Sequence, residues 1–249
     1  MTRRRWIADE VSGNRAALLG EHARHLAQVL RAQIGQEFEI STGTDVRLGR
    51  ICNLQPDRVE FDLEDPVPSP NAWPITIVLS IFKFDRMEWA IEKCVELGVA
   101  RIIPLIAART GSHLSSAAPK RVERWKRIAK QASEQSRRSS APEISSPLRL
   151  PQLLAETRGS RVVFSEVEEE TTLAEAIPSQ VEAVTLAFGP EGGWKEDELA
   201  RFRAEGWAFA SLGPTILRAE TAAIAAVAVC HSIFQSYRCD QEPSRKPIT

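Results

Sequence analysis

The chain has 249 residues, 43% of them hydrophobic, and a formal net charge of -1 at pH 7. This length suits one large domain or two modest ones, and the composition indicates an ordinary globular protein. The four cysteines lie far apart, without a C-x-x-C pair or a recognisable export signal, so neither disulfides nor a zinc site is expected. The longest strongly apolar run, residues 222–230, is too short to cross a bilayer. We therefore expect a cytoplasmic protein without a membrane span.

Charge is unevenly distributed along this nearly neutral chain. Residues 1–31 contain six arginines against three acids, and residues 119–138 contain eight cations against two acids, whereas residues 163–182 are acidic. Two basic patches on a neutral protein suggest contact with a polyanion. They are equally typical of two solvated helix faces, and charge alone leaves both readings open.

The first part of the chain, residues 1–70, has the pattern of a small β-rich domain. EFEIST and RLGRICNLQPDRVEFDL have strand character, with turn residues between them. The stretch DPVPSPNAWP, residues 65–74, then places four prolines within a short span. Because proline fixes φ and lacks an N–H donor, neither a helix nor an inner strand can run through it. We interpret it as a linker.

The second part, residues 74–240, alternates strands with helices. ITIVLSIFK is a continuous apolar run suited to a strand covered on both faces, and RMEWAIEKCVELG has helical spacing that ends at Gly98. RIIPLIA, RVVFSE, VTLAFG and AFASLG supply further strands, separated by helical segments. This alternation predicts an α/β fold with a mostly parallel sheet. Trp89 and Trp125, on predicted helices, are more typical of packing than of base stacking.

The turn GPEGGW follows the strand VTLAFG, where the ligand sites of open α/β sheets lie. It lacks the spacing of the dinucleotide fingerprint G-x-G-x-x-G and the Lys-Ser/Thr pair of a Walker A loop, so it is not a polyphosphate motif. Glycines without Cβ would let main-chain groups approach a flat ligand such as a purine. A tight strand-to-helix turn without a ligand is the alternative.

A second turn, LGPTILRAETA, sets Arg218 before an almost wholly apolar helix that has Glu220 in its first turn. The helix dipole stabilises a carboxylate there and makes it a poor general base. Arg218 cannot be a base, but its guanidinium suits a carbonyl oxygen that acquires negative charge. His22 and His25 have metal-pair spacing, but no further ligand is apparent, so no metal site is expected.

Five motifs in this order resemble the RsmE-type family of ribosomal RNA methyltransferases, which belong to the SPOUT class. The motifs, which together cover nearly the whole chain, are HARHLAQVLR, KFDRMEWAIEKCVELGVARIIPL, KQASEQSRRSSAPEI, FGPEGGWKEDEL and LGPTILRAETAAIAA. The resemblance implies S-adenosylmethionine-dependent methylation of N3 of a uridine in 16S small-subunit ribosomal RNA, carried out by a homodimer. It also implies a PUA-like β-barrel over residues 1–70 and a SPOUT domain with helices on both sheet faces and a carboxy-terminal trefoil knot over residues 74–240. Residues 241–249 are expected to form a disordered tail.

The resemblance also implies the site residues. Arg218 and Glu220 are the expected catalytic residues. Three loops are expected to hold the cofactor through Phe164, Ser165, Glu166, Phe188, Gly189, Pro190, Glu191, Gly192, Gly193, Leu212, Gly213, Ile216 and Leu217. The expected RNA contacts are Arg4, Arg5, Arg31, Lys83, Arg86 and Arg138.

In the matched stretch EQSRR, Glu134, Gln135 and Arg138 either lie near the cofactor or pin their helix to the sheet. The sequence departs from the family pattern at Thr215, where the family commonly has Arg, and at Lys195, where the usual Ser would cap a helix. The sequence is also compatible with two other functions: methylation of another RNA target, and noncatalytic RNA binding during ribosome assembly.

Overall fold

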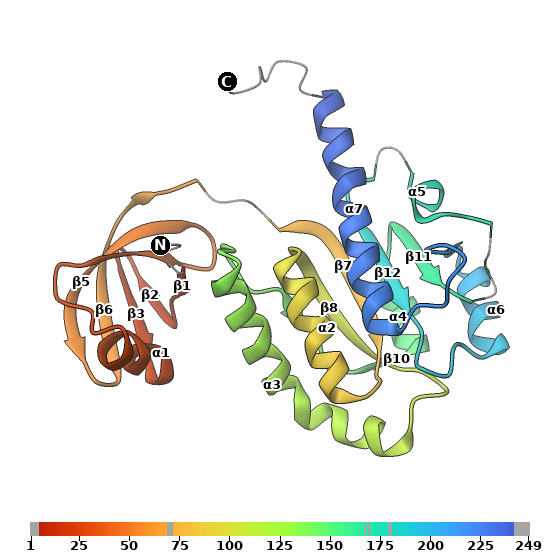
Figure 1. Cartoon of the computed structure of the whole chain (residues 1–249), viewed down its shortest axis with the longest axis horizontal. Helices are drawn as coiled ribbons and strands as arrows, with labels where there is room; N and C mark the ends of the chain where they lie inside the picture. Colours follow the sequence, from red (N-terminus) through yellow and green to blue (C-terminus); the bar gives the residue numbers. More distant parts are fainter. Residues whose placement is uncertain (1–4, 69–71, 167, 169, 179–180, 242–249) are drawn as a thin grey trace. The chain divides into compact units, whose positions relative to one another are not determined.

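The computed structural model describes residues 5–68, 72–166, 168, 170–178 and 181–241 (Figure 1). The chain forms two compact units, residues 1–72 with 129–141, and residues 73–128 with 142–249. The change of unit between Ala72 and Trp73 falls in the proline-rich stretch. Residues 129–141, which the sequence placed in the second domain, belong instead to the first unit. Of the predicted tail, Gln241 ends a helix and residues 242–249 lie outside the described residues.

The first unit is a curled six-stranded sheet. Its spatial order is β1-β4-β5-β6-β3-β2, with β1 parallel to β4 and all other pairs antiparallel. The strands are β1 Trp6–Ile7, β2 Glu10–Ser12, β3 Arg15–Leu19, β4 Glu37–Ser41, β5 Val46–Gln55 and β6 Arg58–Pro66, and two short helices, α1 Gly20–Arg24 and η1 His25–Val29, follow β3. One core of buried side chains, including Trp6, Leu18, Leu26 and Phe61, fills the curl.

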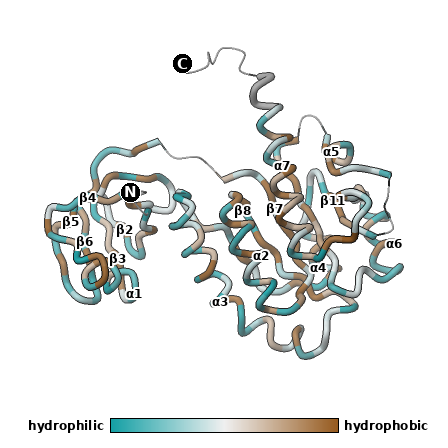
Figure 2. Tube along the Cα trace, viewed as in Figure 1, coloured by the Kyte–Doolittle hydropathy of each residue, from teal (hydrophilic) through white to brown (hydrophobic). Residues whose placement is uncertain are grey.

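The second unit contains a seven-stranded sheet in which every pair is parallel, so the predicted α/β class is confirmed. The order is β10-β8-β7-β12-β11-β13, with β9 also paired to β8. The strands are β7 Trp73–Ser80, β8 Val99–Ile106, β9 Glu143–Ile144, β10 Leu148–Arg149, β11 Ser160–Phe164, β12 Val184–Phe188 and β13 Ala208–Ala210. Figure 2 shows the strongly apolar character of β7 and β8, as expected for strands covered on both faces.

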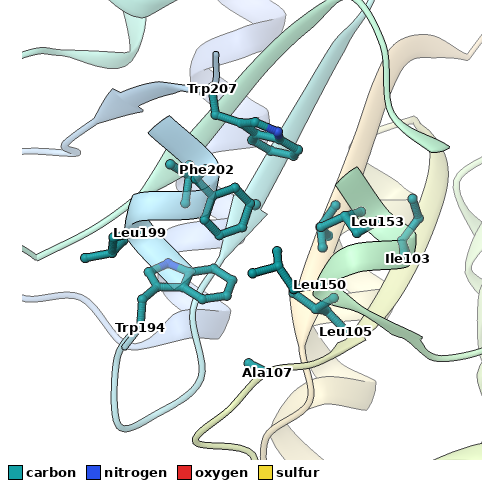
Figure 3. Close-up of a cluster of buried hydrophobic side chains, with 12 residues drawn as sticks. Ile103, Leu105, Ala107, Leu150, Leu153, Trp194, Leu199, Phe202 and Trp207 are labelled. Atoms are coloured by element: carbon teal, nitrogen blue, oxygen red, sulfur yellow. The ribbon is translucent and has the colours of Figure 1, made fainter. Parts of the chain in front are cut away.

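One face of this sheet packs against α4 Leu150–Glu156 and α6 Glu196–Ala204. The side chains of Trp194, Phe202 and Trp207 face Leu150 and Leu153 of α4 (Figure 3). Phe202 lies edge-on to both tryptophans, with ring centroids 5.0 and 4.9 Å apart. Edge-to-face aromatic packing of this kind adds to the burial of apolar area and fixes α6 against the sheet.

The opposite face packs against α2 Phe84–Glu96 and α7 Ala219–Gln241. Since side chains alternate along a strand, Ile77 and Leu79 point away from Val78, which belongs to the α4 and α6 face. The long helix α3 Ser112–Gln135 packs on α2 through Trp125, whose ring centroid lies 6.1 Å from that of Phe84. Trp125 is fully buried, as expected, whereas Trp89 is 48% exposed. No helix among the described residues is long and apolar enough to span a membrane.

Candidate functional site

The second unit contains a cavity of about 1120 Å³ at the carboxyl ends of β11, β12 and β13. All the residues that the sequence predicted to hold a cofactor line it: residues 164–166 and 188–193, with Leu212, Gly213, Ile216 and Leu217. The predicted catalytic residues Arg218 and Glu220 line it as well. Carboxyl ends of parallel strands meet at one edge of the sheet, which is why segments far apart in the sequence share this cavity.

Two aromatic rings form an apolar part of the lining. Phe164 ends β11 and Phe188 ends the neighbouring strand β12. Their rings are stacked, with centroids 4.8 Å apart and planes 6° from parallel, and both residues are buried. The cavity therefore combines flat apolar surface with the main-chain groups of the loops that follow these strands.

The glycine turn after β12 is held to β11 by a tryptophan. Trp194 Nε1 donates a hydrogen bond of 2.9 Å to the Phe164 carbonyl oxygen. A Cβ at Gly189 would lie 3.1 Å from that same Nε1, so glycine lets the indole approach closely. Gly193 has φ of +70°, and its N–H donates to the Pro190 carbonyl at 2.8 Å. This left-handed conformation favours glycine, and it closes the turn on itself.

Cations from two other segments contact the glycine turn. Arg86 Nη1 lies 3.2 Å from Glu191 Oε1, and Arg109 Nη1 donates to the Gly192 carbonyl at 2.6 Å. Lys83 lines the cavity beside them. Sequence reasoning missed Arg109, although a signal existed, since Arg109 closely follows the parallel strand β8, whose carboxyl end lies at the same sheet edge.

The second turn leads from β13 into α7. Gly213 has φ of +114°, and its N–H donates to Ser211 Oγ at 3.2 Å. The Ser211 N–H donates to the Thr171 carbonyl at 2.8 Å, so this turn lies beside the loop that follows β11. Ile216 is 83% exposed, an unusual position for a large apolar side chain.

Glu220 and Arg218 differ sharply in environment. Glu220 is 6% exposed, and its Oε1 lies 3.9 Å from Arg86 Nε. Its Oε2 is buried and has no hydrogen-bond partner among the described residues. Burying an acceptor without a donor is costly, so this oxygen is suited to receive a hydrogen bond from a ligand. Arg218 is exposed and forms no ion pair with any described residue.

Of the two hydrogen bonds of a capping box, the start of α6 has one. Lys195 replaces the usual hydroxyl residue and makes no side-chain cap hydrogen bond, as the sequence predicted. Glu198 Oε2 nevertheless accepts from the Lys195 N–H at 2.9 Å. Its Oε1 accepts from the Ala108 N–H, also at 2.9 Å. The carboxylate thereby joins α6 to the loop that carries Arg109.

A family model described as an RNA methyltransferase domain matches residues 69–231, which include every element of this cavity. The chain belongs to this RNA methyltransferase family. A relative in Bacillus subtilis named ribosomal RNA small subunit methyltransferase E is 31% identical over 90% of this chain and 93% of its own length. A relative of the same name in Mycobacterium bovis is 31% identical over 87% of this chain and 86% of its own length.

Solved structures of similar proteins have the same fold as this methyltransferase. A ribosomal RNA small subunit methyltransferase E from Neisseria gonorrhoeae, bound to S-adenosyl methionine, superposes with a TM-score of 0.83 at 28% identity, covering 93% of this chain and 98% of its own. A methyltransferase from Legionella pneumophila in complex with the cofactor SAM gives 0.81 at 28% identity, covering 92% and 96%. The fold is accordingly SPOUT-type, with the curled sheet as its PUA-like part.

The predicted RNA contacts of this methyltransferase lie in different environments. Lys83 and Arg86 line the cavity, and Arg31 is exposed with φ of +50°. Arg5 is 3% exposed and forms an ion pair of 2.9 Å with Glu39, and Arg138 is 7% exposed, where burial lowers its pKa to about 10. Arg4 lies outside the described residues. Contact between these six residues and RNA stays a prediction.

The EQSRR stretch of this methyltransferase belongs to the first unit, and none of Glu134, Gln135 and Arg138 lines the cavity. Glu134 Oε1 accepts from the Ile7 N–H of β1 at 3.4 Å, so this stretch is held to the sheet of the first unit, and its proximity to the cofactor stays a prediction. Glu134 is fully buried there, with Oε2 3.6 Å from His22 Nε2. Among the residues that the structure describes, no group of three or more His, Cys, Asp or Glu side chains could hold a metal ion.

Proposed function

We propose that this methyltransferase transfers a methyl group from S-adenosylmethionine to N3 of a uridine in 16S small-subunit ribosomal RNA. The observation that supports this most strongly is the cavity itself, which is lined by two glycine turns that follow β12 and β13, on either side of β11, and by a cationic rim. The names of the similar proteins support the choice of ribosomal RNA. Family membership supports the reaction class.

The cavity residues fit an adenosine-bearing sulfonium compound. Its volume of about 1120 Å³ exceeds that of a typical small-ligand site, which leaves room for a nucleobase beside the cofactor. The stacked Phe164 and Phe188 rings offer apolar surface, and the glycines let main-chain groups approach a flat purine. The Glu220 Oε2 atom has an unused acceptor position. When bound, S-adenosylmethionine supplies an electrophilic methyl group.

Arg218 is assigned to stabilise the reacting base. Uridine N3 must lose its proton before it can attack a methyl carbon, and the resulting negative charge spreads onto the neighbouring carbonyl oxygens. A guanidinium placed beside those oxygens acts as an oxyanion hole does, which is typically worth about 3 to 4 kcal/mol per donor. Arg218 is free of ion pairs among the described residues, so its charge is not already neutralised.

Glu220 is assigned one of two roles, to orient the loop or to relay the uridine N3 proton through water. Its carboxylate lies in the first turn of α7, near the positive end of the helix dipole. It also lies near Arg86, which contacts Glu191 in the glycine turn. The carboxylate and Arg86 thereby connect the two turns that surround the cavity.

The RNA is assigned to the cationic rim. A uridine within folded RNA must leave its stack to reach a buried methyl group, so recognition combines phosphate contacts with a flipped base. Lys83 and Arg109 line the cavity and suit the phosphates next to such a base, while Arg86 holds the glycine turn through Glu191. The active form is assigned as a homodimer, in which exposed Ile216 is available to a second copy; sedimentation analysis of the purified protein tests this assignment.

The decisive experiment combines a methyl-transfer assay with nucleotide mapping. Purified protein and labelled S-adenosylmethionine are incubated separately with 30S subunits, free 16S ribosomal RNA and transfer RNA, and the product is mapped by mass spectrometry. The expected product is N3-methyluridine at one position in the small-subunit RNA. A methylated ribose or a modified transfer RNA would contradict the proposed target.

A noncatalytic role in ribosome assembly is the second candidate, and calorimetry separates the two. An enzyme must bind S-adenosylmethionine, whereas an assembly factor with the same fold need not. Absence of cofactor binding, together with retained binding to small-subunit RNA, would favour the second candidate. Comparison of ribosomal RNA from a deletion strain and its parent then tests the same assignment in cells.

A further inference from the structure

A second cavity, of about 600 Å³, is lined by three arginines. Arg158 follows α4, Arg161 lies near the start of β11, and Arg201 lies on α6. None of the three was singled out in the sequence, because Arg158 and Arg201 are 43 positions apart and the three form no motif. The remaining lining residues are Pro151, Leu154, Ala155, Ala204 and Glu205.

These arginines differ from most others in the described chain in having no carboxylate partner. Arg203, two residues beyond Arg201 on the same helix, pairs with Glu196 at 3.7 Å. Glu205 lines the arginine cavity, but within the described residues it forms no ion pair with Arg158, Arg161 or Arg201. Unpaired guanidinium groups that share one cavity are suited to bind an external anion.

Two of the arginines are held in place by main-chain carbonyl groups. Arg158 Nη1 donates to the Thr157 carbonyl at 2.9 Å, and Arg161 Nη2 donates to the Glu205 carbonyl at 2.8 Å. These carbonyls lie at the ends of α4 and α6, where each helix dipole contributes about half a negative charge. The two helix ends and the Glu205 carboxylate together offset about two of the three arginine charges, so the cavity keeps a net positive charge.

Two elements, β11 and α6, contribute lining residues to both the arginine cavity and the cofactor cavity. Along β11, Arg161 lies near the amino end and Phe164, which lines the cofactor cavity, ends the strand. Three residues of a strand span about 10 Å. On α6, Leu199 lines the cofactor cavity and Arg201 lines the arginine cavity. The two cavities therefore lie at opposite ends of β11 and share α6, so one RNA molecule can contact both.

We propose that Arg158, Arg161 and Arg201 form a binding site for backbone phosphates of the substrate RNA, separate from the cavity that receives the reacting uridine. The inference rests on the proposed function, since it takes the polyanion to be RNA. A guanidinium fork matches a phosphate group bidentately, and such contacts position the RNA without reading its sequence. The site would contribute to RNA affinity and leave the methyl-transfer step unchanged.

The test uses the double variant Arg158→Ala/Arg201→Ala in the full-length chain. Arg161 is left in place because its guanidinium also lies 5.8 Å from the Trp207 ring and helps to hold α6. Binding of a labelled small-subunit RNA fragment is measured by fluorescence anisotropy over a series of KCl concentrations. We expect the slope of log K against log salt to become shallower by about 0.7 to 1.4, which corresponds to the loss of one or two phosphate contacts. We also expect a KM for RNA raised several-fold at unchanged kcat.

Two matched variants control for charge and folding. Arg203→Ala removes an arginine from the same helix that already has a carboxylate partner, and it should leave slope and KM unchanged. Arg158→Lys/Arg201→Lys keeps the charges without the fork and should restore most of the salt slope. Thermal unfolding of each variant, together with calorimetry of S-adenosylmethionine binding, checks that the cofactor cavity is intact.

An unchanged slope and KM in the double alanine variant, with a wild-type protein that binds and methylates RNA, would overturn the inference and leave the proposed function standing. A titration with inorganic phosphate separates a small-anion site from an RNA site. Phosphate binding that is lost in the double variant, with RNA binding unaffected, would also overturn the assignment to RNA. A wild-type protein that methylates no RNA would instead contradict the proposed function.

Discussion

Arg218 and Arg86 line the same cavity, but they differ in how far neighbouring carboxylates neutralise their positive charge. Arg86 is shared between Glu191, at 3.2 Å, and Glu220, at 3.9 Å. Arg218 has no carboxylate partner among the described residues. A cation already neutralised by two carboxylates responds weakly to new negative charge, so the exposed Arg218 is better suited to the transition state and Arg86 to holding the loops.

Arg218→Ala is expected to lower kcat by about 100-fold to 1000-fold, because it removes one donor to the charge that develops on the uracil oxygens. Single-turnover methylation of small-subunit RNA measures this effect, and calorimetry should give unchanged S-adenosylmethionine affinity. Arg203→Ala, outside both cavities, serves as the control and should keep full activity. Full turnover by Arg218→Ala with bound cofactor would remove Arg218 from the mechanism.

Gly193→Ala and Gly159→Ala form a matched pair of variants. Both glycines have positive φ, +70° and +77°, so alanine at either position should destabilise the fold by about 1 to 2 kcal/mol. Gly193 lines the cofactor cavity, whereas a Cβ at Gly159 would meet nothing within 4 Å. Only Gly193→Ala should weaken S-adenosylmethionine binding in calorimetry. An equal loss of affinity in both variants would show that the effect is one of stability alone.

The strands contribute residues to the cofactor cavity mainly at their carboxyl ends and in the loops that follow. β8, β11 and β12 each end at the cofactor cavity edge, and the hydrogen bonds from Trp194, Arg109 and Ala108 tie the following loops together. The helix α3 is a different case. Its last turns belong to the first unit, where Lys130 Nζ lies 2.5 Å from Asp9 Oδ1 and Glu134 is fully buried.

Asp9 is expected to make the first unit sensitive to acid. Burial by itself would raise the pKa of Asp9, but hydrogen bonds from His22, Lys130 and the Leu19 N–H outweigh it and hold the pKa well below its usual value. A carboxylate whose pKa is depressed in the folded state stabilises the fold above its unfolded pKa of about 3.9. That stabilisation is lost as the pH falls through the folded value.

Asp9→Asn should therefore lower the free energy of unfolding by about 1 to 2 kcal/mol at pH 7, and by less as the pH falls below about 4. Denaturant unfolding at pH 7, 4 and 3, followed by circular dichroism, measures the difference from wild type. Asp65→Asn, at an exposed carboxylate near the end of β6, is the control and should change little. A difference that stays constant with pH would contradict the role of the Asp9 charge.

The first unit is discontinuous in sequence. Residues 129–141 supply partners to residues 1–72: Lys130 to Asp9, Glu134 to His22, and the Ser139 carbonyl to the Ser41 hydroxyl. Ser41 is fully buried, so without that segment its O–H would have no acceptor, and only the bond that its oxygen accepts from the Gly43 N–H would remain. A buried polar group without a partner costs about 1 to 3 kcal/mol, a large fraction of a small domain's stability.

A fragment of residues 1–72 is accordingly expected to unfold at markedly lower temperature than a chain in which residues 129–141 are joined to it by a Gly-Ser linker. Thermal melting followed by circular dichroism compares the two. A joined chain with a scrambled 129–141 segment controls for added length. Equal cooperative transitions in all three would mean that the first 72 residues form the unit alone.

Strand and helix periods, glycines and prolines are local properties of the chain, so the sequence was enough to predict most strands of the parallel sheet, its α/β class and the two glycine turns, but not α4 or the short strands β9 and β10. Its ordered motifs also led to the family that the comparisons confirmed. The tertiary structure alone decided that Arg109 meets Gly192, that EQSRR lies in the first unit, and that three distant arginines share a cavity. These facts depend on which segments far apart in the chain become neighbours, and no local period encodes that.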